Sequence, residues 1–263
     1  MTGLTLGLRR TRRTAPLTQN VGQLMLILFD IDDTLLDHSA AARAGAIALH
    51  ESVGASVSVE EFVSLWGAAL ERHIARYLAG EVTYQEQRRA RIREVVDVTL
   101  TDAGADRLFE NYLAAYEAGW SLFPDVTACL DMLSCSHSLG VVSNGEAQQQ
   151  RKKLVNTGIA DRFKCILVSD ECGFAKPSKE IFLRACEIAG ESPRNALYVG
   201  DRYDVDAQGA REAGLVGVWL DRLGRATRHH LPPVIPALDE LSRLLDSRAL
   251  PNPALHSRRV QWR

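Results

Sequence analysis

The sequence predicts an α/β fold, in which a Rossmann-like parallel sheet carries helices on both faces and an all-helical domain is inserted after the first strand. Short, continuous apolar runs typical of strands buried on both faces recur along the chain, and helical patterns lie between them. One long interval, residues 38–123, interrupts this alternation with helical spacing only. Alternating strands and helices favour a parallel sheet, and the interruption favours the inserted helical domain.

The sheet is expected to be built from short apolar runs. The first run, Leu24–Phe29, ends directly before Asp30. Further strands are expected at 139–143, 165–169, 196–200 and 215–220, with helices at 146–157, 178–189 and 204–213, and with a closing edge strand and helix at 233–235 and 238–245. These elements assign residues 24–37 and 124–247 to one core domain.

Residues 38–123 are expected to fold as a compact bundle of about four helices. Ser58 and Thr83 each precede a glutamate by three residues, the pattern of a capping box at a helix start. Apolar side chains repeat at helical spacing on two faces: Phe62, Leu65, Trp66 and Ala69 on one, and Leu108, Phe109, Tyr112, Leu113 and Tyr116 on the other. The polar group Arg72, His73, Arg76 and Tyr77 could meet an anionic substrate, although a solvated helix face is the favoured interpretation.

Charge and cysteine content exclude several classes of protein. Residues 1–26 and 248–263 each hold four arginines and no acid, and we expect disorder in residues 1–23 and 248–263. Residues 27–247 carry 23 Lys and Arg against 33 Asp and Glu, a poor electrostatic match for nucleic acid. The first apolar run is far too short for a membrane span, so no membrane partner is expected. The five cysteines form no C-x-x-C pair, which indicates buried thiols in a reducing compartment and a cytoplasmic location.

The most informative segment follows the first expected strand. Asp30, Asp32 and Asp33 place three carboxylates within four residues, and such carboxylates repel one another unless a cation lies between them. Asp30 and Asp32 share one face if the chain stays extended. A D-x-D pair alone is weak evidence, because turn and helix-cap acids give the same pattern. We expect Asp33 to accept backbone N–H groups and Asp204 to cap the helix that follows the fourth strand.

Polar residues also follow the other expected strands. Ser143, Asn144 and Gly145 end the second strand, Lys176 precedes a helix, and Gly200 with Asp201 ends the fourth strand, ahead of Asp206. Because ligands of parallel sheets bind outside the carboxyl ends of the strands, we expect these residues to converge in one crevice. The sequence contains neither a G-x-x-x-x-G-K-[ST] loop nor a G-x-G-x-x-G loop, so it does not support nucleotide folds of those kinds.

In this order and spacing the residues resemble the four motifs of the haloacid dehalogenase (HAD) superfamily. Asp30, Asp32 and Thr34 match the first motif, Ser143 the second, Lys176 the third, and Gly200, Asp201 and Asp206 the fourth. The resemblance covers about residues 24–247. The inserted helices resemble the class I cap of the superfamily. These inserted helices, together with the segment Ser143-Asn144-Gly145, resemble those of the superfamily branch that contains pyrimidine 5′-nucleotidases and N-acylneuraminate-9-phosphatases.

The resemblance implies a role for each residue. Asp30 is implied as the nucleophile and Asp32 as the general acid and base. Mg²⁺ is implied as the cofactor, held by Asp30, the Asp32 carbonyl and Asp201. Ser143, Asn144 and Lys176 are implied to bind the substrate phosphate, with support from Thr34 through hydrogen bonding, from Gly145, and from Asp206.

The implied activity is Mg²⁺-dependent hydrolysis of a small phosphate monoester, such as a sugar phosphate or nucleoside monophosphate, through an aspartyl-phosphate. Asp32 favours a phosphatase over a dehalogenase, because a halide leaving group needs no proton. A phosphomutase of the β-phosphoglucomutase type would share these residues and stays open as an alternative. A catalytically inert scaffold that binds a partner is the third possibility. The sequence carries no signal for the oligomeric state.

Overall fold

The computed structural model describes residues 25–226 and 232–246. The arm and tail expected to be disordered, residues 1–23 and 248–263, lie outside the described residues. Within the described part of the chain, six parallel strands form one sheet in the order β3-β2-β1-β4-β5-β6. The strands are β1 Leu26–Phe29, β2 Ser138–Ser143, β3 Cys165–Val168, β4 Ala196–Gly200, β5 Val216–Leu220 and β6 Val234–Ile235. The predicted α/β class and the edge position of the last strand are confirmed.

The register of the central strands aligns the motifs. Phe29, the last residue of β1, pairs with Val141 of β2 and with Val199 of β4. The residues that follow these three positions therefore emerge side by side at the carboxyl edge of the sheet. All four residues of β1 are fully buried, as its unbroken apolar sequence predicts.

Helices cover both faces of the sheet. Successive side chains of β1 point to opposite faces, and because all of them are apolar, both faces need a covering layer. Ile27 and Phe29 belong to a core that α5 and α10 complete, and Leu26 and Leu28 to a second core with α8 and α9. The helices of this part are α5 Val126–Ser134, α6 Ala147–Asn156, α7 Ser169–Cys172, α8 Lys179–Ala189, α9 Gly209–Glu212 and α10 Glu240–Asp246, with 3₁₀ turns at Ala160–Arg162 and Pro193–Asn195. Helices α5 and α7 were not among the predicted elements.

The helix expected at 204–213 is divided. It begins as a π-helical segment, η3 (Tyr203–Gln208), and continues as α9. The backbone of η3 lies directly on the sheet, since a Cβ added to Gly217 of β5 would come within 1.9 Å of the Ala207 carbonyl oxygen. A Cβ on Gly200 would likewise lie 2.4 Å from the Asp206 carboxylate. The two glycines therefore let η3 approach closely enough to bring Asp206 to the end of β4.

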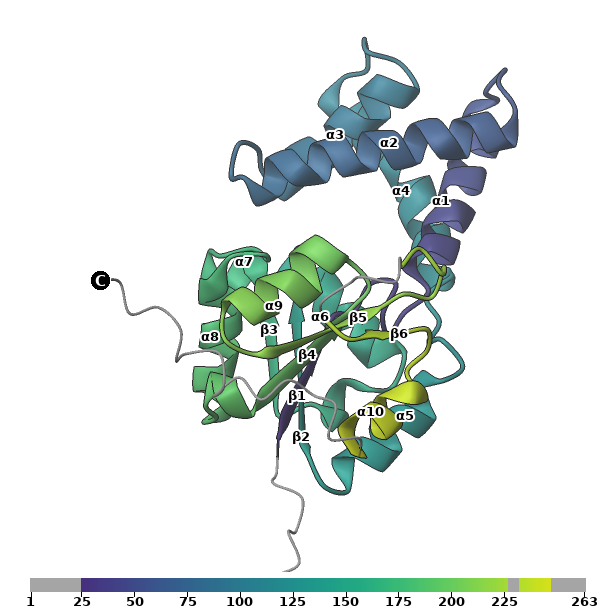
Figure 1. Cartoon of the computed structure of the whole chain (residues 1–263). Helices are drawn as coiled ribbons and strands as arrows, with labels where there is room; N and C mark the ends of the chain where they lie inside the picture. The colour runs from purple at the N-terminus through teal and green to yellow at the C-terminus, as the bar shows by residue number, and fades with distance from the viewer. Residues whose placement is uncertain (1–24, 227–231, 247–263) are drawn as a thin grey trace, which may run out of the picture.

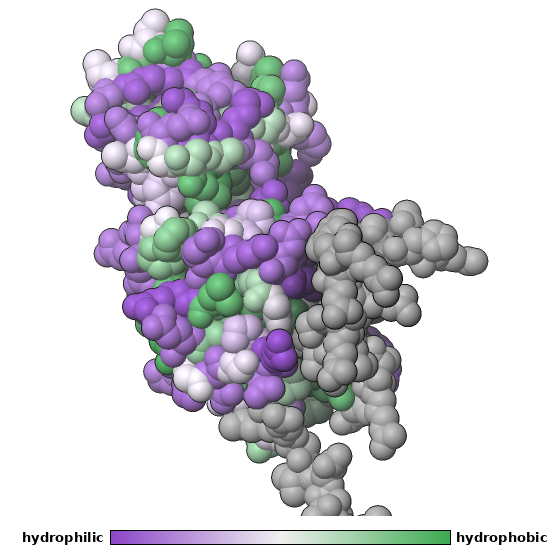
Figure 2. All heavy atoms as spheres, turned by 60° about the vertical axis from the view of Figure 1, so that its left-hand side comes forward, coloured by the Kyte–Doolittle hydropathy of each residue, from purple (hydrophilic) through white to green (hydrophobic). Residues whose placement is uncertain are grey.

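The inserted segment forms four helices: α1 His38–Val53, α2 Val59–Leu78, α3 Tyr84–Val95 and α4 Asp102–Ala118. We call these four helices the cap bundle. In the bundle α1 packs along α4 and α2 along α3, and Figure 1 shows it beyond the carboxyl ends of the strands. Figure 2 shows the bundle and the sheet-bearing part as two lobes whose visible surface is largely hydrophilic.

The predicted apolar faces of the cap bundle are confirmed in their main residues. Phe62, Trp66 and Ala69 of α2 and Phe109, Tyr112 and Tyr116 of α4 are buried. Leu65 is 46% exposed, so its assignment to the buried face was wrong. Thr83 forms both halves of a capping box, whereas Ser58 only accepts the Glu61 N–H.

The cysteines are free, but they are not all buried. Cys129, Cys165 and Cys186 are buried, Cys172 is half-buried and Cys135 is exposed. The expectation of uniformly buried thiols was therefore wrong for Cys135, which lies where α5 ends and the chain turns toward β2. Among the described helices none has both the length and the apolarity to cross a membrane.

Candidate active site

A cleft between the sheet and the cap bundle contains nearly all of the predicted site residues. The space between its walls is about 1100 Å³ when the solvent in its open mouth is included. The sheet side contributes Asp30, Asp32, Ser143, Asn144, Gly145, Lys176, Asp201 and Asp206. The cap bundle closes the opposite side with residues of α2, α3 and α4. Thr34 does not line the cleft.

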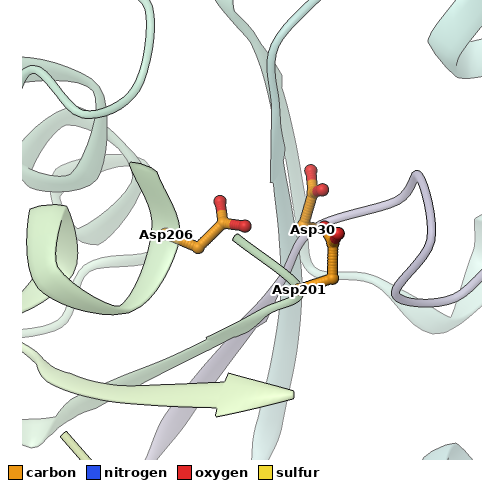
Figure 3. A group of neighbouring side chains, drawn as sticks. All are labelled: Asp30, Asp201 and Asp206. Atoms are coloured by element: carbon orange, nitrogen blue, oxygen red, sulfur yellow. The ribbon is translucent and has the colours of Figure 1, made fainter. Parts of the chain in front are cut away.

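Three carboxylates meet on the floor of this cleft. Asp30 follows β1, Asp201 follows β4, and Asp206 belongs to η3; one oxygen from each lies within 4.8 Å of the others. Figure 3 shows Asp206 directed toward the other two carboxylates. Burial and repulsion from Asp206 raise the pKa of Asp30 to about 6 despite Lys176, and burial together with Asp30 raises the pKa of Asp201 to about 8. The cluster carries more negative charge than its own residues neutralise.

Lys176 is the cation that the protein itself places in this cluster. Its Nζ donates hydrogen bonds to Asp30 Oδ1, Asp206 Oδ1 and the Tyr198 hydroxyl, each at 2.7 Å. The Tyr198 hydroxyl donates in turn to the Val142 carbonyl at 2.7 Å. Burial alone would lower the pKa of Lys176, but Asp206 and Asp30 raise it above the ordinary value. Lys176 is therefore a fixed positive charge with all three N–H bonds directed.

The remaining carboxylate oxygens suit a divalent cation. Asp206 is occupied on both oxygens, since Oδ1 accepts from Lys176 and Oδ2 accepts the Arg202 N–H at 3.0 Å. The Asp201 carboxylate, by contrast, has no hydrogen-bond or ion-pair partner among the described residues. Asp30 and Asp201 thus offer hard oxygen ligands where negative charge is in excess, the chemistry that Mg²⁺ prefers. These residues fit the implied cofactor, with Asp206 in a supporting position.

Asp32 is held by residues that the sequence did not point out. Lys153 of α6 donates to both carboxylate oxygens of Asp32 at 2.6 and 2.8 Å, and Gln150 Nε2 donates to Oδ2 at 3.1 Å. His38 Nδ1 lies 3.5 Å from Oδ1. Although burial favours the neutral acid, Lys153 and His38 lower the pKa of Asp32 to about 2. The i, i+3 spacing of Gln150 and Lys153 was the available signal for a buried face of α6.

The segment after β2 holds Lys176 in place, and few of its hydrogen-bond donors are left for a ligand. The Asn144 side chain donates Nδ2 to the Lys176 carbonyl at 3.0 Å and accepts the Lys176 N–H at 2.8 Å. The Gly145 N–H donates to Ser169 Oγ at 3.0 Å. Ser143 Oγ accepts from Gln150 Nε2 at 2.7 Å and lines the cleft. We therefore revise the expected role of the Asn144 side chain from phosphate binding to positioning of Lys176.

Two expectations for neighbouring residues were wrong. The Thr34 hydroxyl is fully buried without a hydrogen-bond partner among the described residues, so it does not brace the loop. The bracing is made by the Thr34 carbonyl, which accepts from Arg222 Nη2 at 3.0 Å. Asp204 is exposed within η3 and caps no helix. Asp33 behaves as expected, because its carboxylate accepts the Ser39 N–H and hydroxyl, both at 2.8 Å.

The polar residues predicted on α2 do not face the cleft floor. Arg72 and His73 pair with Glu94, and Arg76 pairs with Glu81 on the bundle surface. The Tyr77 hydroxyl donates to Asp170 Oδ1 at 2.9 Å and so connects α2 to α7. The favoured interpretation, a solvated face, thus applies to Arg72 and Arg76. The cleft is lined instead by residues of α3 that the sequence analysis did not single out: Tyr84, Gln87 and Arg91.

Comparison with known proteins agrees with this arrangement. The chain is 33% identical over 218 residues to a glyceraldehyde 3-phosphate phosphatase of Methanopyrus kandleri. The aligned region covers 74% of this chain and 83% of that protein. It is 28% identical to the pyrimidine 5′-nucleotidase YjjG of Escherichia coli, over 83% of this chain and 96% of the relative.

Solved structures show the same fold over most of the chain. The HAD-hydrolase YfnB of Bacillus subtilis, solved bound to magnesium, superposes with a TM-score of 0.71 at 27% identity and covers 85% of this chain and 99% of its own. A 2-haloacid dehalogenase of Pseudomonas syringae pv. Tomato superposes with a TM-score of 0.63 at 26% identity, over 85% of this chain and 98% of its own. The profile of haloacid dehalogenase-like hydrolases matches residues 24–214. The chain therefore belongs to the haloacid dehalogenase-like hydrolase family.

Proposed function

We propose that the protein is a Mg²⁺-dependent phosphatase that hydrolyses a small phosphate monoester through an aspartyl-phosphate. The observation that supports this most strongly is the environment of Asp30. Its carboxylate lies beside Asp201 and in contact with Lys176, with Asp32 two residues away, at the floor of the cleft. The relatives named above as a phosphatase and a nucleotidase act on phosphate esters, which supports the same reaction here.

In this proposal Asp30 is the nucleophile. Its carboxylate forms a bond to phosphorus while the bond from phosphorus to the ester oxygen breaks, and the alcohol leaves. Water then attacks the aspartyl-phosphate, releasing inorganic phosphate and restoring the carboxylate. Lys176 is charged and fixed 2.7 Å from Asp30 Oδ1, so it stabilises the negative charge that the phosphoryl oxygens carry in both steps. Ser143 Oγ lines the same floor and is assigned to a phosphoryl oxygen.

Asp32 is assigned to proton transfer. Lys153 and Gln150 hold it as a carboxylate, the form that accepts a proton from the attacking water in the second step. The leaving alcohol needs that proton in the first step of the next turnover. We propose that the arriving ester weakens the contact between Asp32 and Lys153, so that Asp32 carries the proton to the ester oxygen.

The metal requirement follows from the charge of the site. Asp30, Asp201 and the Asp32 carbonyl are assigned to hold Mg²⁺, and Asp206 to hold Lys176. When bound, Mg²⁺ supplies positive charge that offsets the phosphate dianion and aligns its oxygens. The pKa values of Asp30 and Asp201 are raised, which means that holding both carboxylates in the charged form costs free energy when no cation is bound.

We further propose that residues 24–37 and 124–247 form the catalytic core and that residues 38–123 form its cap. Two contacts support a cap that rests on the core: Tyr77 with Asp170 at 2.9 Å and Lys152 with Glu117 at 2.6 Å. A cap in this position excludes bulk water from the cleft during phosphoryl transfer.

The test is phosphate release from a panel of phosphorylated metabolites in Mg²⁺ or EDTA. We expect hydrolysis that EDTA abolishes and that Asp30→Asn abolishes, while Asp204→Asn, an exposed acid on η3, retains it. Activity that survives EDTA or Asp30→Asn would contradict the mechanism. Isomer interconversion with little free phosphate would indicate the mutase. Release of halide from a 2-haloacid, without phosphate release, would indicate a dehalogenase, and no binding of beryllofluoride with Mg²⁺ would indicate an inert scaffold.

A further inference from the structure

We propose that Arg91 and Gln87 of α3 bind a carboxylate and a neighbouring hydroxyl or amine on the leaving group of the substrate. The preferred substrates are then phosphorylated hydroxy or amino acids rather than neutral sugar phosphates. This inference rests on the proposed phosphatase function, and it assigns the half of the cleft that lies opposite Asp30.

Arg91 is a buried cation for which the described part of the chain supplies no anionic partner. Its side chain lines the cleft although the residue is only 4% exposed. Three aromatic rings surround the guanidinium, with centroids 4.9 Å away for Trp66, 5.0 Å for Phe109 and 5.6 Å for Tyr112. Within the described residues no carboxylate pairs with it, and its Nε has no hydrogen-bond partner. Burial lowers the pKa of Arg91, and the nearby cation Arg88 acts in the same direction.

Gln87 repeats the pattern one helical turn earlier. It lines the cleft and is fully buried, and neither its Nε2 nor its Oε1 has a hydrogen-bond partner in residues 25–226 and 232–246. Buried polar groups in folded proteins are nearly always paired, so unpaired groups on adjacent turns indicate partners from outside the chain. The amide needs one acceptor and one donor, and Arg91 needs an anion. A carboxylate flanked by a hydroxyl or amine supplies all three.

None of the acidic residues that line the cleft supplies that anion. Lys153 is paired with Asp32, and Lys176 with Asp30 and Asp206. Arg202 also lines the cleft from the sheet side, but it is exposed to solvent, unlike the buried Arg91. Two glutamates also line the cleft. Glu146 accepts the N–H groups of Gln148 and Gln149 at the start of α6, and Glu71 is exposed on α2. Neither forms an ion pair with Arg91.

The positions of the two groups fit a leaving group. Asp30, Lys176 and Ser143 lie on the sheet side of the cleft, and α3 lies on the cap side of the same cleft. A phosphoryl group bound to the floor therefore leaves its alcohol portion facing α3 and the aromatic residues of α4. An arginine donates a bidentate pair of hydrogen bonds to a carboxylate, and it discriminates against a neutral group because its charge would then stay unpaired.

The test compares matched esters that differ in the carboxylate. We would measure kcat/KM for 3-phosphoglycerate against glycerol 3-phosphate and for 6-phosphogluconate against sorbitol 6-phosphate. We expect at least one pair in which the wild-type protein prefers the acid by about 10- to 100-fold, the range of a hydrogen bond to a charged group. Arg91→Met is expected to reduce that preference to about one, mainly through KM, with Arg91→Lys intermediate and Gln87→Leu reducing it in part.

The control is Arg72→Met, which removes an exposed cap cation and is expected to keep the preference of the wild-type protein. Equal rates for both members of every pair, or a preference that survives Arg91→Met, would overturn the proposal. So would a preference for fructose 1,6-bisphosphate over fructose 6-phosphate without any preference for carboxylates, because the ligand would then be a second phosphate.

A binding measurement separates this inference from the catalytic proposal. Glyceric and gluconic acids, the dephosphorylated products, are titrated into the wild-type protein and into Arg91→Met by calorimetry. Binding of either acid that the variant loses supports the inference even if no ester is hydrolysed. Hydrolysis of neutral esters that depends on Asp30, with no acid bound, overturns the inference and leaves the phosphatase assignment standing. The unfolding temperature of each variant verifies that it is folded.

Discussion

Tyr198→Phe removes one oxygen atom from the centre of the core, and its effect follows from two hydrogen bonds. The hydroxyl accepts from Lys176 Nζ and donates to the Val142 carbonyl, both at 2.7 Å, and Tyr198 is fully buried. Burial and Asp206 raise the pKa of Tyr198 far above its ordinary value, so the hydroxyl stays protonated at every physiological pH. The substitution leaves a charged donor short of one acceptor and a carbonyl short of one donor.

The expected loss combines one hydrogen bond to a charged group and one neutral hydrogen bond, about 2–4 kcal/mol in total. For a protein of this size that corresponds to a decrease of about 5–15 °C in the unfolding temperature. Lys176 keeps its bonds to Asp30 and Asp206, so phosphate release is expected to fall less than in Lys176→Met.

The assay is thermal unfolding by calorimetry, with phosphate release measured in parallel. Tyr77→Phe is the matched control, because its hydroxyl makes one hydrogen bond to Asp170 near the surface, and we expect a change of about 0.5 kcal/mol or less. The reasoning is refuted if Tyr198→Phe unfolds at the temperature of Tyr77→Phe, since the hydroxyl would then contribute nothing to the core.

Three further predictions concern other parts of the structure: the contact between β5 and η3, the metal site, and the ion pair of Asp125 with Arg222. Gly217→Ala should unfold the protein or lower its unfolding temperature severely, because the new Cβ would lie 1.9 Å from the Ala207 carbonyl oxygen. In Gly67→Ala the new Cβ would meet nothing within 4 Å among the described residues, so this change in α2 should stabilise the protein by about 0.5–1 kcal/mol. Similar unfolding temperatures for the two variants would contradict this prediction. Mg²⁺ at 100 times its Kd should stabilise the wild-type protein by about 2.7 kcal/mol and should fail to stabilise Asp201→Asn, as measured by melting with and without EDTA. Burial would raise the pKa of Asp125, but Arg222 and the Leu238 N–H lower it below the ordinary value. The Asp125 carboxylate therefore stabilises the folded protein above the pKa of the unfolded state, and this contribution is lost as the pH falls through the pKa of the folded state. The difference in melting temperature between wild type and Arg222→Met should therefore shrink below about pH 4, and a constant difference would count against the pair.

The sequence predicts the floor of the site because its residues follow strands directly. Asp30 and Asp201 come immediately after apolar runs, and parallel pairing places the ends of β1 and β4 side by side without any knowledge of the loops. The same reasoning brings Ser143 to the same edge. A strand end is a local feature of the chain, and the parallel sheet converts it into a position in space.

Residues that act on the floor from a distance carry no comparable signal. Lys153 lies 121 residues from Asp32 in the chain, and Tyr198 lies 22 residues from Lys176 within an apolar run that predicts only a buried strand. Their contacts depend on how α6 packs and on which face of β4 a side chain occupies. The Thr34 hydroxyl shows the converse, because a motif match suggested a hydrogen bond that the packing does not provide.

The cap side is harder to predict for a different reason. Helix α3 contains so many polar residues, Tyr84–Val95 including four arginines, that its apolar pattern does not define a buried face. Arg91 is buried by α2 and α4, which supply the rings around it, so its burial is a property of the assembled bundle. A polar helix in sequence thus becomes a lining of the cleft only after the other helices have packed.

The two sides of the cleft differ in how completely the chain satisfies its own polar groups, and this difference separates reaction from recognition. On the floor, every N–H bond of Lys176 and both oxygens of Asp206 have partners, so the charges that we propose act on phosphorus are fixed before substrate arrives. On the cap, Gln87 and Arg91 leave buried polar atoms unpaired, and folding carries that cost. A ligand that pairs them recovers the cost on binding, whereas a ligand that cannot pair them leaves it in place. Selectivity for the leaving group is therefore expected to reside in α3, while the reaction itself resides at the ends of β1 and β4.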